Sequence, residues 1–550
     1  MQQLIECVPN FSEGNDLSII HQITRQIEAV EGARVLNVDP GKATNRTVVT
    51  IVGTPEAVVE AAFRAIKKAG ELIDMSKHKG EHPRMGATDV CPFIPIANIS
   101  MEETAVYATQ LAKRVGEELN IPVYLYEAAQ PNKQRSNLSV IRAGEYEGFL
   151  KKIQMPEWKP DFGPATFDAK RGATVIGARD FLVAYNVNLN TTSTRRANAI
   201  AFDVREAGRT IEENGVKIHQ PGTLKSVKAI GWFIEEYGIA QISMNLTNIN
   251  ITPMHIAFDE VCKKADARGI RVTGSELVGL IPLKSMLDAG KYFLQKQKRS
   301  VGVSEKELIK IAVKSLGLEE LTPFKPEERI IEYLLKNTGD SRLVNMQLNA
   351  FADETASESP APGGGSVSAY IGSLGIALAT MVANLSSHKK GWDSRWEEFS
   401  QWAAKGQQLK DELIRLVDAD TAAFNKIMEA FALPKSSSEE KNYRTQKIQE
   451  ATKFAIEVPY KVMETSLAGM ELIKAMAQTG NPNSVSDAGV GALCARSAVM
   501  GAFMNVRINA ADYDDKNYVA ELVKNGTLIQ EKAQALEAEI IELVNEKIGL

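Results

Sequence analysis

The sequence is poor in cysteine and carries no strong charge of one sign. Its four cysteines (Cys7, Cys91, Cys262 and Cys494) are scattered over 550 residues without a CxxC pair. This spacing argues against a disulfide framework or a zinc knuckle and fits a reducing compartment. The formal net charge is −5, which supplies no general attraction for nucleic acid or an anionic membrane. We therefore expect neither as a partner.

The start of the chain also lacks a basic stretch followed by an apolar run, so we expect no targeting segment and a cytoplasmic protein. One stretch is long enough to resemble a membrane span, because residues 363–387 carry no charge. Ten of these 25 positions are Gly or Ser, however, and no aromatic belt flanks them. That composition favours a closely packed helix in a soluble bundle.

The first half of the chain alternates between strand and helix patterns. Residues 33–40 and 46–54 are β-branched runs bounded by turn residues, whereas 17–32 and 55–74 place apolar residues three and four positions apart. This alternation predicts sheets covered by helices. A stretch rich in Pro and Gly over 155–182 predicts an extended crossing to a second α/β unit.

The strand patterns end near residue 334, where a polar stretch predicts a linker. Helical patterns follow over 363–388, 396–432, 439–479, 486–511 and 517–548. The predicted fold is multidomain: two α/β subdomains and then an all-α helical domain. We place the boundaries at 1–181, 182–333, a linker over 334–341, and 342–550.

One loop concentrates titratable residues. Residues 76–95 contain His78, His82, Arg84 and Asp89 between prolines and glycines. Histidine suits proton transfer at neutral pH, and loops of this kind often carry catalytic groups. A metal site on the two histidines is one alternative, but the nearby Pro and Gly disfavour a helix there and no HExxH pattern exists. A purely structural loop is the other.

Two further residues, Asp39 and Arg46, follow a predicted strand. The surrounding segment resembles a phosphate loop, but position 36, where that motif needs a glycine, is leucine. Nucleoside triphosphate hydrolysis is therefore excluded. A carboxylate and a guanidinium at a strand end remain reasonable ligands for a polar substrate.

Amide side chains alternate with apolar ones in two strand patterns of the second unit. Asn186 and Asn188 lie on one face of residues 181–190, and Asn245 lies on one face of residues 240–252. The pattern predicts either solvent-facing positions or the polar wall of a pocket for a heteroaromatic ligand.

In the helical half, Asp420 lies within the apolar stripe of residues 409–427, and Asp418 lies on another face. A carboxylate on an apolar stripe is costly unless it is paired or protonated. Burial would raise its pKa, as a general acid requires. Alternatively, Asp420 bonds a helix end or a nearby serine. Three glycines at 363–365 precede a helix, a start that favours anions.

These segments together resemble the formimidoyltransferase-cyclodeaminase family, bifunctional enzymes of histidine degradation. The resemblance covers essentially the whole chain. It rests on segments in the same order: CVPNFSEG (7–14), HKGEHPRMGATDVCPFIP (78–95), FGPATF (162–167), GSELVGLIPLK (274–284), EERIIEYL (327–334), APGGGSV (361–367), LVDAD (416–420) and NVRIN (505–509).

The resemblance implies transfer of a formimino group from N-formimino-L-glutamate to tetrahydrofolate, then cyclisation to 5,10-methenyltetrahydrofolate with loss of ammonia and without a metal. It implies that His82 is the transferase base; Asp39 and Arg46 match active-site residues less firmly. The cyclodeaminase aspartate falls at 416–420, where segment matching favours Asp418 and the stripe favours Asp420. The implied folate segment comprises Gly163, Pro164, Ala165, Thr166, Phe167, Asp168, Ala169, Lys170, Arg171 and Gly172.

Two expectations concern partners. Lys170 and Arg171 are basic, which predicts a polyglutamylated folate whose tail carboxylates they attract. The uncharged helix over 363–387 is more than one small bundle can bury, which predicts a homo-oligomer, at least a dimer. Two alternatives remain: an active transferase with a non-catalytic helical oligomerisation domain, and a folate-binding protein without catalysis.

Overall fold

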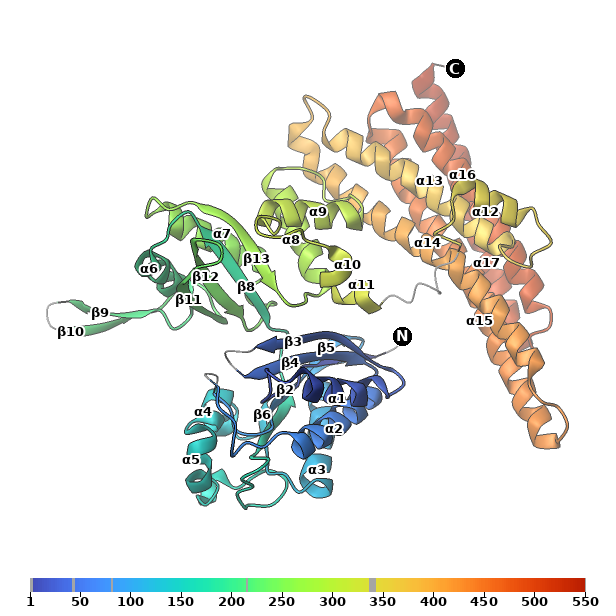
Figure 1. Ribbon diagram of the computed structural model, residues 1–550. Coiled ribbons are helices and arrows are strands. Elements are labelled where there is room, and N and C mark those ends of the chain that lie inside the picture. Colours follow the sequence, from blue (N-terminus) through green and yellow to red (C-terminus); the bar gives the residue numbers. More distant parts are fainter. Residues whose placement is uncertain (1–2, 42–44, 81–82, 214–215, 336–342, 550) are drawn as a thin grey trace. The chain divides into compact units, whose positions relative to one another are not determined.

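The computed structural model describes residues 3–41, 45–80, 83–213, 216–335 and 343–549 (Figure 1). The chain divides into two compact units. Met1–Ser285 and Leu316–Leu334 form the first, which is α/β, and Met286–Ser315 and Leu335–Leu550 form the second, which is helical. The predicted fold class, α/β parts followed by an all-α part, is confirmed.

The first unit begins with a seven-stranded sheet in the order β1-β4-β2-β5-β7-β6, with β3 paired to β4. Strands β5, β7 and β6 run parallel, and the other pairs are antiparallel. The strands predicted over 33–40 and 46–54 are confirmed as β3 and β4. The bounds are β1 (Leu4–Cys7), β2 (Asn10–Phe11), β3 (Ala33–Gly41), β4 (Arg46–Gly53), β5 (Thr88–Ala97), β6 (Val123–Glu127) and β7 (Thr174–Ala178).

Helices α1 (Leu17–Glu28), α2 (Pro55–Leu72) and α3 (Met101–Glu118) cover one face of this sheet (Figure 1). Side chains alternate across a strand, so every second residue of β1, β4 and β5 points into the helices. Those buried residues include Ile5, Cys7, Ile51, Cys91 and Phe93. The intervening residues face the other side, where α1–α3 do not pack.

Three short elements, α4 (Leu138–Arg142), α5 (Glu145–Lys152) and η2 (Pro156–Trp158), form a second small core. Within it the Phe149 ring lies 6.0 Å from Tyr124, edge to face, and 6.0 Å from Phe167. Such aromatic packing holds α5 in place beside the parallel strands. It also fixes the positions of Glu145 and Glu147 in the first turn of α5.

A four-stranded antiparallel sheet in the order β11-β12-β8-β13 completes the first unit, with α6 (Thr194–Val204) and α7 (Met254–Asp266) packed on it. A separate hairpin of β9 (Arg209–Glu213) and β10 (Val216–Gln220) precedes β11. The sheet strands are β8 (Val183–Leu189), β11 (Val227–Ile234), β12 (Ile239–Leu246) and β13 (Val272–Val278).

Among the described residues of the helical unit are five long helices, each within two residues of its predicted limits. They surround one core to which each contributes buried residues. The helices are α12 (Leu348–Thr355), which is short, and then α13 (Gly364–Ser387), α14 (Trp396–Ala432), α15 (Ser438–Thr479), α16 (Val485–Ala510) and α17 (Lys516–Ile548).

By length and composition, Gly364–Ser387 and Pro482–Ala510 would suit a membrane span. Both contribute residues to the helical core, including Ile376, Ala379, Ala495 and Val499, which are fully buried. Closely packed core helices made of small residues pass the same hydropathy test.

The helical unit also takes in Met286–Ser315, which contains most of α8 (Leu283–Lys296) and α9 (Glu305–Leu316). The carbonyl oxygen of Gly302 accepts hydrogen bonds from the side-chain amides of Asn384 (2.8 Å) and Gln407 (3.2 Å). The segment therefore packs on α13 and α14, although the chain returns to the first unit at Leu316. Nothing in the sequence pattern indicates this exchange.

Candidate active sites

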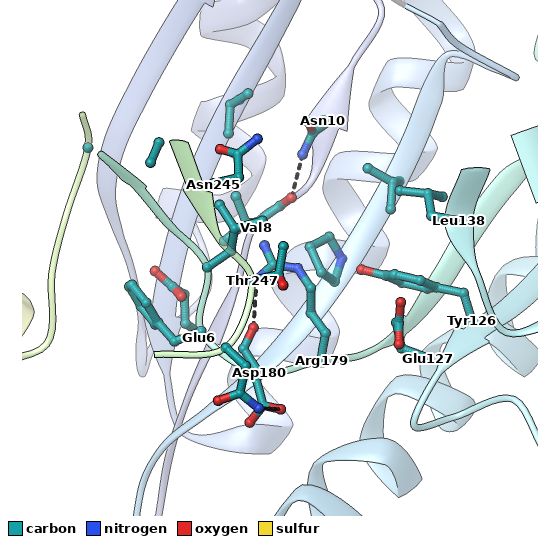
Figure 2. Close-up of a pocket in the computed structure, with 18 of the residues that line it drawn as sticks. Glu6, Val8, Asn10, Tyr126, Glu127, Leu138, Arg179, Asp180, Asn245 and Thr247 are labelled. Atoms are coloured by element: carbon teal, nitrogen blue, oxygen red, sulfur yellow. Dashed lines mark hydrogen bonds between the residues drawn. The ribbon is translucent and has the colours of Figure 1, made fainter. Parts of the chain in front are cut away.

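A cavity of about 890 Å³ lies against the face of the seven-stranded sheet that α1–α3 do not cover. This volume is within the range of small-molecule sites. Its lining includes Glu6 of β1, Asn10 of β2 and Val8 between these strands. Asn245 of β12 and Thr247, which follows β12, line it as well (Figure 2). The alternation that buries Ile5 and Cys7 beneath the helices is what places Glu6 and Val8 in the cavity.

Glu6 is the most deeply buried carboxyl group of this lining, with 4% of its surface exposed. Burial raises its pKa to about 7, and the positive charge of Arg179 opposes the rise. Arg179 in turn donates a hydrogen bond from Nη1 to the carbonyl oxygen of Asp180 (2.8 Å, Figure 2). Tyr126 and Glu127 also line the cavity, and burial raises the pKa of each.

Three of the predicted substrate residues, Asp39, Arg46 and Asn245, line this cavity. Asn186 and Asn188 do not. The Asn186 amide donates to Glu276 (3.2 Å), and the fully buried Asn188 donates to Glu320 (2.6 Å). Each buried amide thus bonds a carboxylate, as buried amides require. Glu276 lies in β13, whereas Glu320 is exposed and lies outside the sheet.

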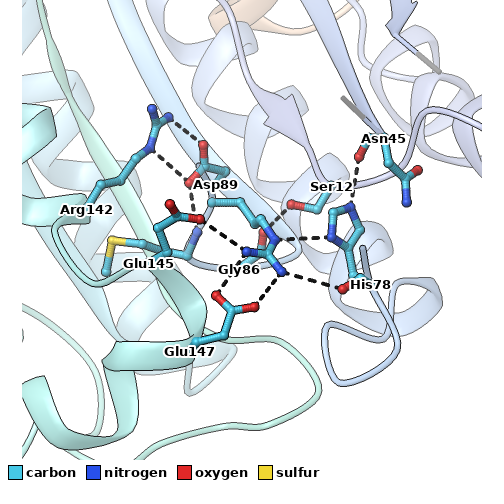
Figure 3. A network of polar contacts seen from close by, with 10 residues as sticks. Ser12, Asn45, His78, Gly86, Asp89, Arg142, Glu145 and Glu147 are labelled. Carbon is cyan, nitrogen blue, oxygen red and sulfur yellow. Dashed lines mark hydrogen bonds and ion pairs between the residues drawn. The ribbon is translucent and has the colours of Figure 1, made fainter. Parts of the chain in front are cut away.

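Arg46 and Arg142 line the cavity in addition to Arg179. Asp89, which is fully buried, accepts hydrogen bonds from Nε (3.2 Å) and Nη2 of Arg142 and from the backbone N–H of Met85 (3.0 Å, Figure 3). Burial lowers the pKa of Arg46 to about 10, which the charge of Asp89 opposes and the charge of Arg142 promotes. Sequence reasoning missed Arg142, since an arginine ending a short helix gives no signal by itself.

Arg84 fixes the loop of residues 76–95, the histidine loop, and is only 8% exposed. Its guanidinium forms ion pairs with Glu145 (3.2 Å) and Glu147 (2.7 Å) at the start of α5 (Figure 3). Its Nε also donates to Nδ1 of His78 (3.3 Å). His82, the predicted base, and Glu81 lie outside the described residues.

The predicted folate segment, 163–172, does not contribute to the cavity lining. Its basic residues bond helix ends: Lys170 Nζ donates to the carbonyl oxygen of Glu71 (2.9 Å), and Arg171 Nη1 donates to that of Leu119 (2.7 Å). Gly172 has a φ of +68°, and a Cβ there would lie 2.2 Å from the carbonyl oxygen of Met85. The segment thus packs directly against the histidine loop.

In the helical unit, Asp420 binds the start of α13. One carboxylate oxygen accepts from the backbone N–H (2.8 Å) and the hydroxyl (3.0 Å) of Ser366. This matches the alternative that Asp420 bonds a helix end and a serine. A Cβ at Gly365 would lie 2.2 Å from the Asp420 carboxylate, so a glycine is needed at this point.

Asp418, on another face of α14, accepts a hydrogen bond from the backbone N–H of Leu343 (2.9 Å). Burial raises the pKa of both Asp418 and Asp420, and the hydrogen bonds that each accepts oppose the rise. Among the described residues, no group of three His, Cys, Asp or Glu side chains could hold a metal ion.

Comparison with known proteins gives matches along the whole chain. Residues 4–179 match the formiminotransferase domain, N-terminal subdomain; residues 184–336 match the formiminotransferase domain; and residues 347–526 match formiminotransferase-cyclodeaminase. Formimidoyltransferase-cyclodeaminase of Gallus gallus is 46% identical over 548 residues, covering 100% of both chains.

Two relatives match parts of the chain. Glutamate formimidoyltransferase of Thermoplasma acidophilum is 44% identical over 294 residues, which is 53% of this chain and 92% of the relative. Methenyltetrahydrofolate cyclohydrolase of Methylorubrum extorquens is 36% identical over 205 residues, which is 37% of this chain and 99% of the relative. With its full-length match and its successive domains, the chain belongs to the formimidoyltransferase-cyclodeaminase family.

Proposed function

We propose that this chain transfers the formimino group of N-formimino-L-glutamate to tetrahydrofolate and then cyclises the product to 5,10-methenyltetrahydrofolate. The observation that carries the proposal is the succession of both formiminotransferase subdomains and the cyclodeaminase domain in one chain. The two α/β parts perform the transfer, and the helical part performs the cyclisation. The predicted boundaries, 1–181, 182–333 and 342–550 with a linker over 334–341, serve as the working division.

In the first reaction, N5 of tetrahydrofolate attacks the amidine carbon of the donor. His82 takes the N5 proton and returns it to the glutamate nitrogen as the carbon–nitrogen bond to glutamate breaks. The products are 5-formimidoyltetrahydrofolate and glutamate. The cavity beside Asp39, Arg46 and Asn245 supplies polar ligands for these reactants, and the segment 163–172, which packs against the histidine loop, contributes to the folate site.

In the second reaction, N10 attacks the same carbon, and the nitrogen of the former imino group leaves as ammonia, which closes the methenyl bridge. A protonated carboxyl group assists that departure. We assign the acid to Asp418, because Asp420 already holds the start of α13 through Ser366. Asp420 then has a positioning role at the start of α13, and Asp418 acts from the other face of α14.

Three further properties belong to the proposal. Exposed apolar side chains on α13 and α16, among them Leu374, Met381 and Leu493, support a homo-oligomer of at least two copies. Lys170 is exposed and suits the carboxylates of a polyglutamylated folate. All four cysteines are free, which suits a cytoplasmic enzyme.

The test is to mix the purified full-length protein with N-formimino-L-glutamate and tetrahydrofolate. We expect release of glutamate, release of ammonia and the absorbance of methenyltetrahydrofolate. Glutamate without ammonia would favour the alternative in which the helical domain only assembles copies. Supplied 5-formimidoyltetrahydrofolate separates the two steps, because the second reaction should convert it without a donor. Release of none of these products would contradict catalysis and favour a folate-binding protein.

A further inference from the structure

Arg142 is held in a fixed orientation at the wall of the cavity. Its Nε and Nη2 both bond Asp89, and its side chain is 14% exposed while that of Asp89 is 1% exposed. A guanidinium has five N–H donors in a rigid fork. Asp89 occupies the edge of the fork formed by Nε and Nη2. The hydrogens on Nη1 therefore remain for another acceptor, since Nη1 bonds none of the described residues.

Arg46 is the second guanidinium in this part of the lining. Its charge is coupled to those of Arg142, Asp89 and Asp39. Burial and the charge of Arg142 disfavour the Arg46 cation, and the charges of Asp89 and Asp39 offset part of that cost. An anion that accepts hydrogen bonds from both guanidinium groups offsets more of it. Since Asp89 has already restricted the Arg142 side chain, little conformational entropy is lost when a ligand binds.

We propose that Arg142, oriented by Asp89 and acting with Arg46, binds a carboxylate of the formimino donor and selects donors that carry it. This inference rests on the proposed function and names the recognition group within that site. Charge-assisted hydrogen bonds from arginine to carboxylate are among the stronger polar contacts in proteins.

The position of Asp89 favours the donor over the folate tail. Asp89 also accepts the backbone N–H of Met85, which follows the predicted base His82 by three residues. Three residues of chain span at most about 11 Å. The donor carries its carboxylates within a few bonds of the reacting amidine carbon, whereas the glutamate tail of folate lies at the far end of that molecule from N5. A carboxylate site beside this loop therefore suits the donor.

The experiment is steady-state kinetics on the full-length protein, with each substrate varied at saturating levels of the other. In R142Q we expect the KM for N-formimino-L-glutamate to rise roughly 10- to 100-fold, as loss of a hydrogen bond to a charged group predicts, while the KM for tetrahydrofolate stays within about twofold. The inhibition constant of the product glutamate should rise in the same ratio. N-formiminoglycine keeps only the α-carboxylate of the donor, and N-formimino-4-aminobutyrate keeps only the γ-carboxylate. Whichever of the two lacks the carboxylate that Arg142 binds should show no difference between R142Q and the parent.

R135Q is the matched control. Arg135 also pairs with a carboxylate in the same part of the fold, Asp161 at 3.0 Å, and its side chain is 16% exposed, but it does not line the cavity. R135Q should leave both KM values unchanged. If R142Q fails to fold because Asp89 loses its partner, R142K keeps a charge beside Asp89 and should still raise the donor KM about tenfold, since lysine lacks the fork.

An unchanged donor KM in a folded Arg142 variant would overturn the inference and leave the proposed function intact. Equal increases in both KM values would also overturn it, because they indicate a general distortion. If the parent protein transfers no formimino group, the proposed function fails instead. Calorimetric titration with L-glutamate then still tests the site: binding by the parent and not by R142Q supports it, and equal behaviour contradicts it.

Discussion

Arg84 donates a hydrogen bond from Nε to Nδ1 of His78 across 3.3 Å. Arginine does not release its proton in proteins, so Nδ1 must be the acceptor and the neutral imidazole carries its hydrogen on Nε2. That nitrogen lies 2.8 Å from the carbonyl oxygen of Asn45, to which it donates (Figure 3). Both nitrogens of His78 are therefore engaged in holding the loop. His78 is not available as the base of the transferase.

The two histidines should accordingly behave differently. We expect H82A to lower formimino transfer by about 10²–10⁴-fold, the usual loss for a general base, and to spare cyclisation of supplied 5-formimidoyltetrahydrofolate. H78Q, the control, keeps a donor toward Asn45 and should retain transfer within about tenfold. Glutamate release and methenyl absorbance measure the two steps. Near-normal transfer in H82A would remove His82 from the mechanism.

Glu6 should make the seven-stranded sheet sensitive to pH. Its folded pKa of about 7 exceeds the ordinary value of 4.5, so the folded state binds the proton more tightly than the unfolded state. Stability therefore falls as pH rises from about 4.5 to about 7, by about 3 kcal/mol in total. Hydrogen exchange of peptides covering β1, corrected for intrinsic rates, should show this loss between pH 5 and pH 8.

E6Q should abolish that pH dependence, because the amide does not titrate. E117Q, at an exposed position on α3, is the control and should retain it. If the E6Q protein still loses protection of β1 between pH 5 and pH 8, another group is responsible.

The two aspartates of α14 should separate catalysis from stability. D418N should lose cyclodeaminase turnover while its melting temperature is kept. D420A removes the acceptor for the Ser366 N–H and hydroxyl, and loss of such a cap costs about 0.5–2 kcal/mol. Its melting temperature should therefore fall. Parent-like cyclisation of 5-formimidoyltetrahydrofolate by both variants would place the acid elsewhere.

Neighbouring glycines test the packing of the α13 start. In G365A the new Cβ would meet the Asp420 carboxylate at 2.2–2.7 Å, so the carboxylate must shift and cyclisation should fall along with stability. In G363A the nearest atom is 3.9 Å away, the carbonyl oxygen of Pro360, and little should change. Thermal melting and turnover of 5-formimidoyltetrahydrofolate measure both. Equal behaviour of the two variants would contradict the close approach at Gly365.

The sequence by itself determined the helical half. The limits of α13 to α17 follow from apolar periodicity, from the caps Ser437 of α15 and Asp515 of α17, and from glycine and proline breaks. All of these act within a few residues of chain. Strands β3 and β4 were predictable for the same local reason. Asp420 was also recognisable as unusual, because a carboxylate on an apolar stripe must find a partner.

Only the tertiary structure decided which polar residues meet. Alternation identified the amide faces of β8 and β12. In the structure, Asn186 bonds Glu276, 90 positions away, and Asn188 bonds Glu320, 132 positions away. Asn245, in contrast, reaches the cavity. Glu6 and Arg142 gave no local signal, since strand order brings the first beside Arg179 and packing of α4 brings the second onto Asp89. Sequence patterns report short-range preferences, whereas a site depends on contacts between residues far apart in the chain.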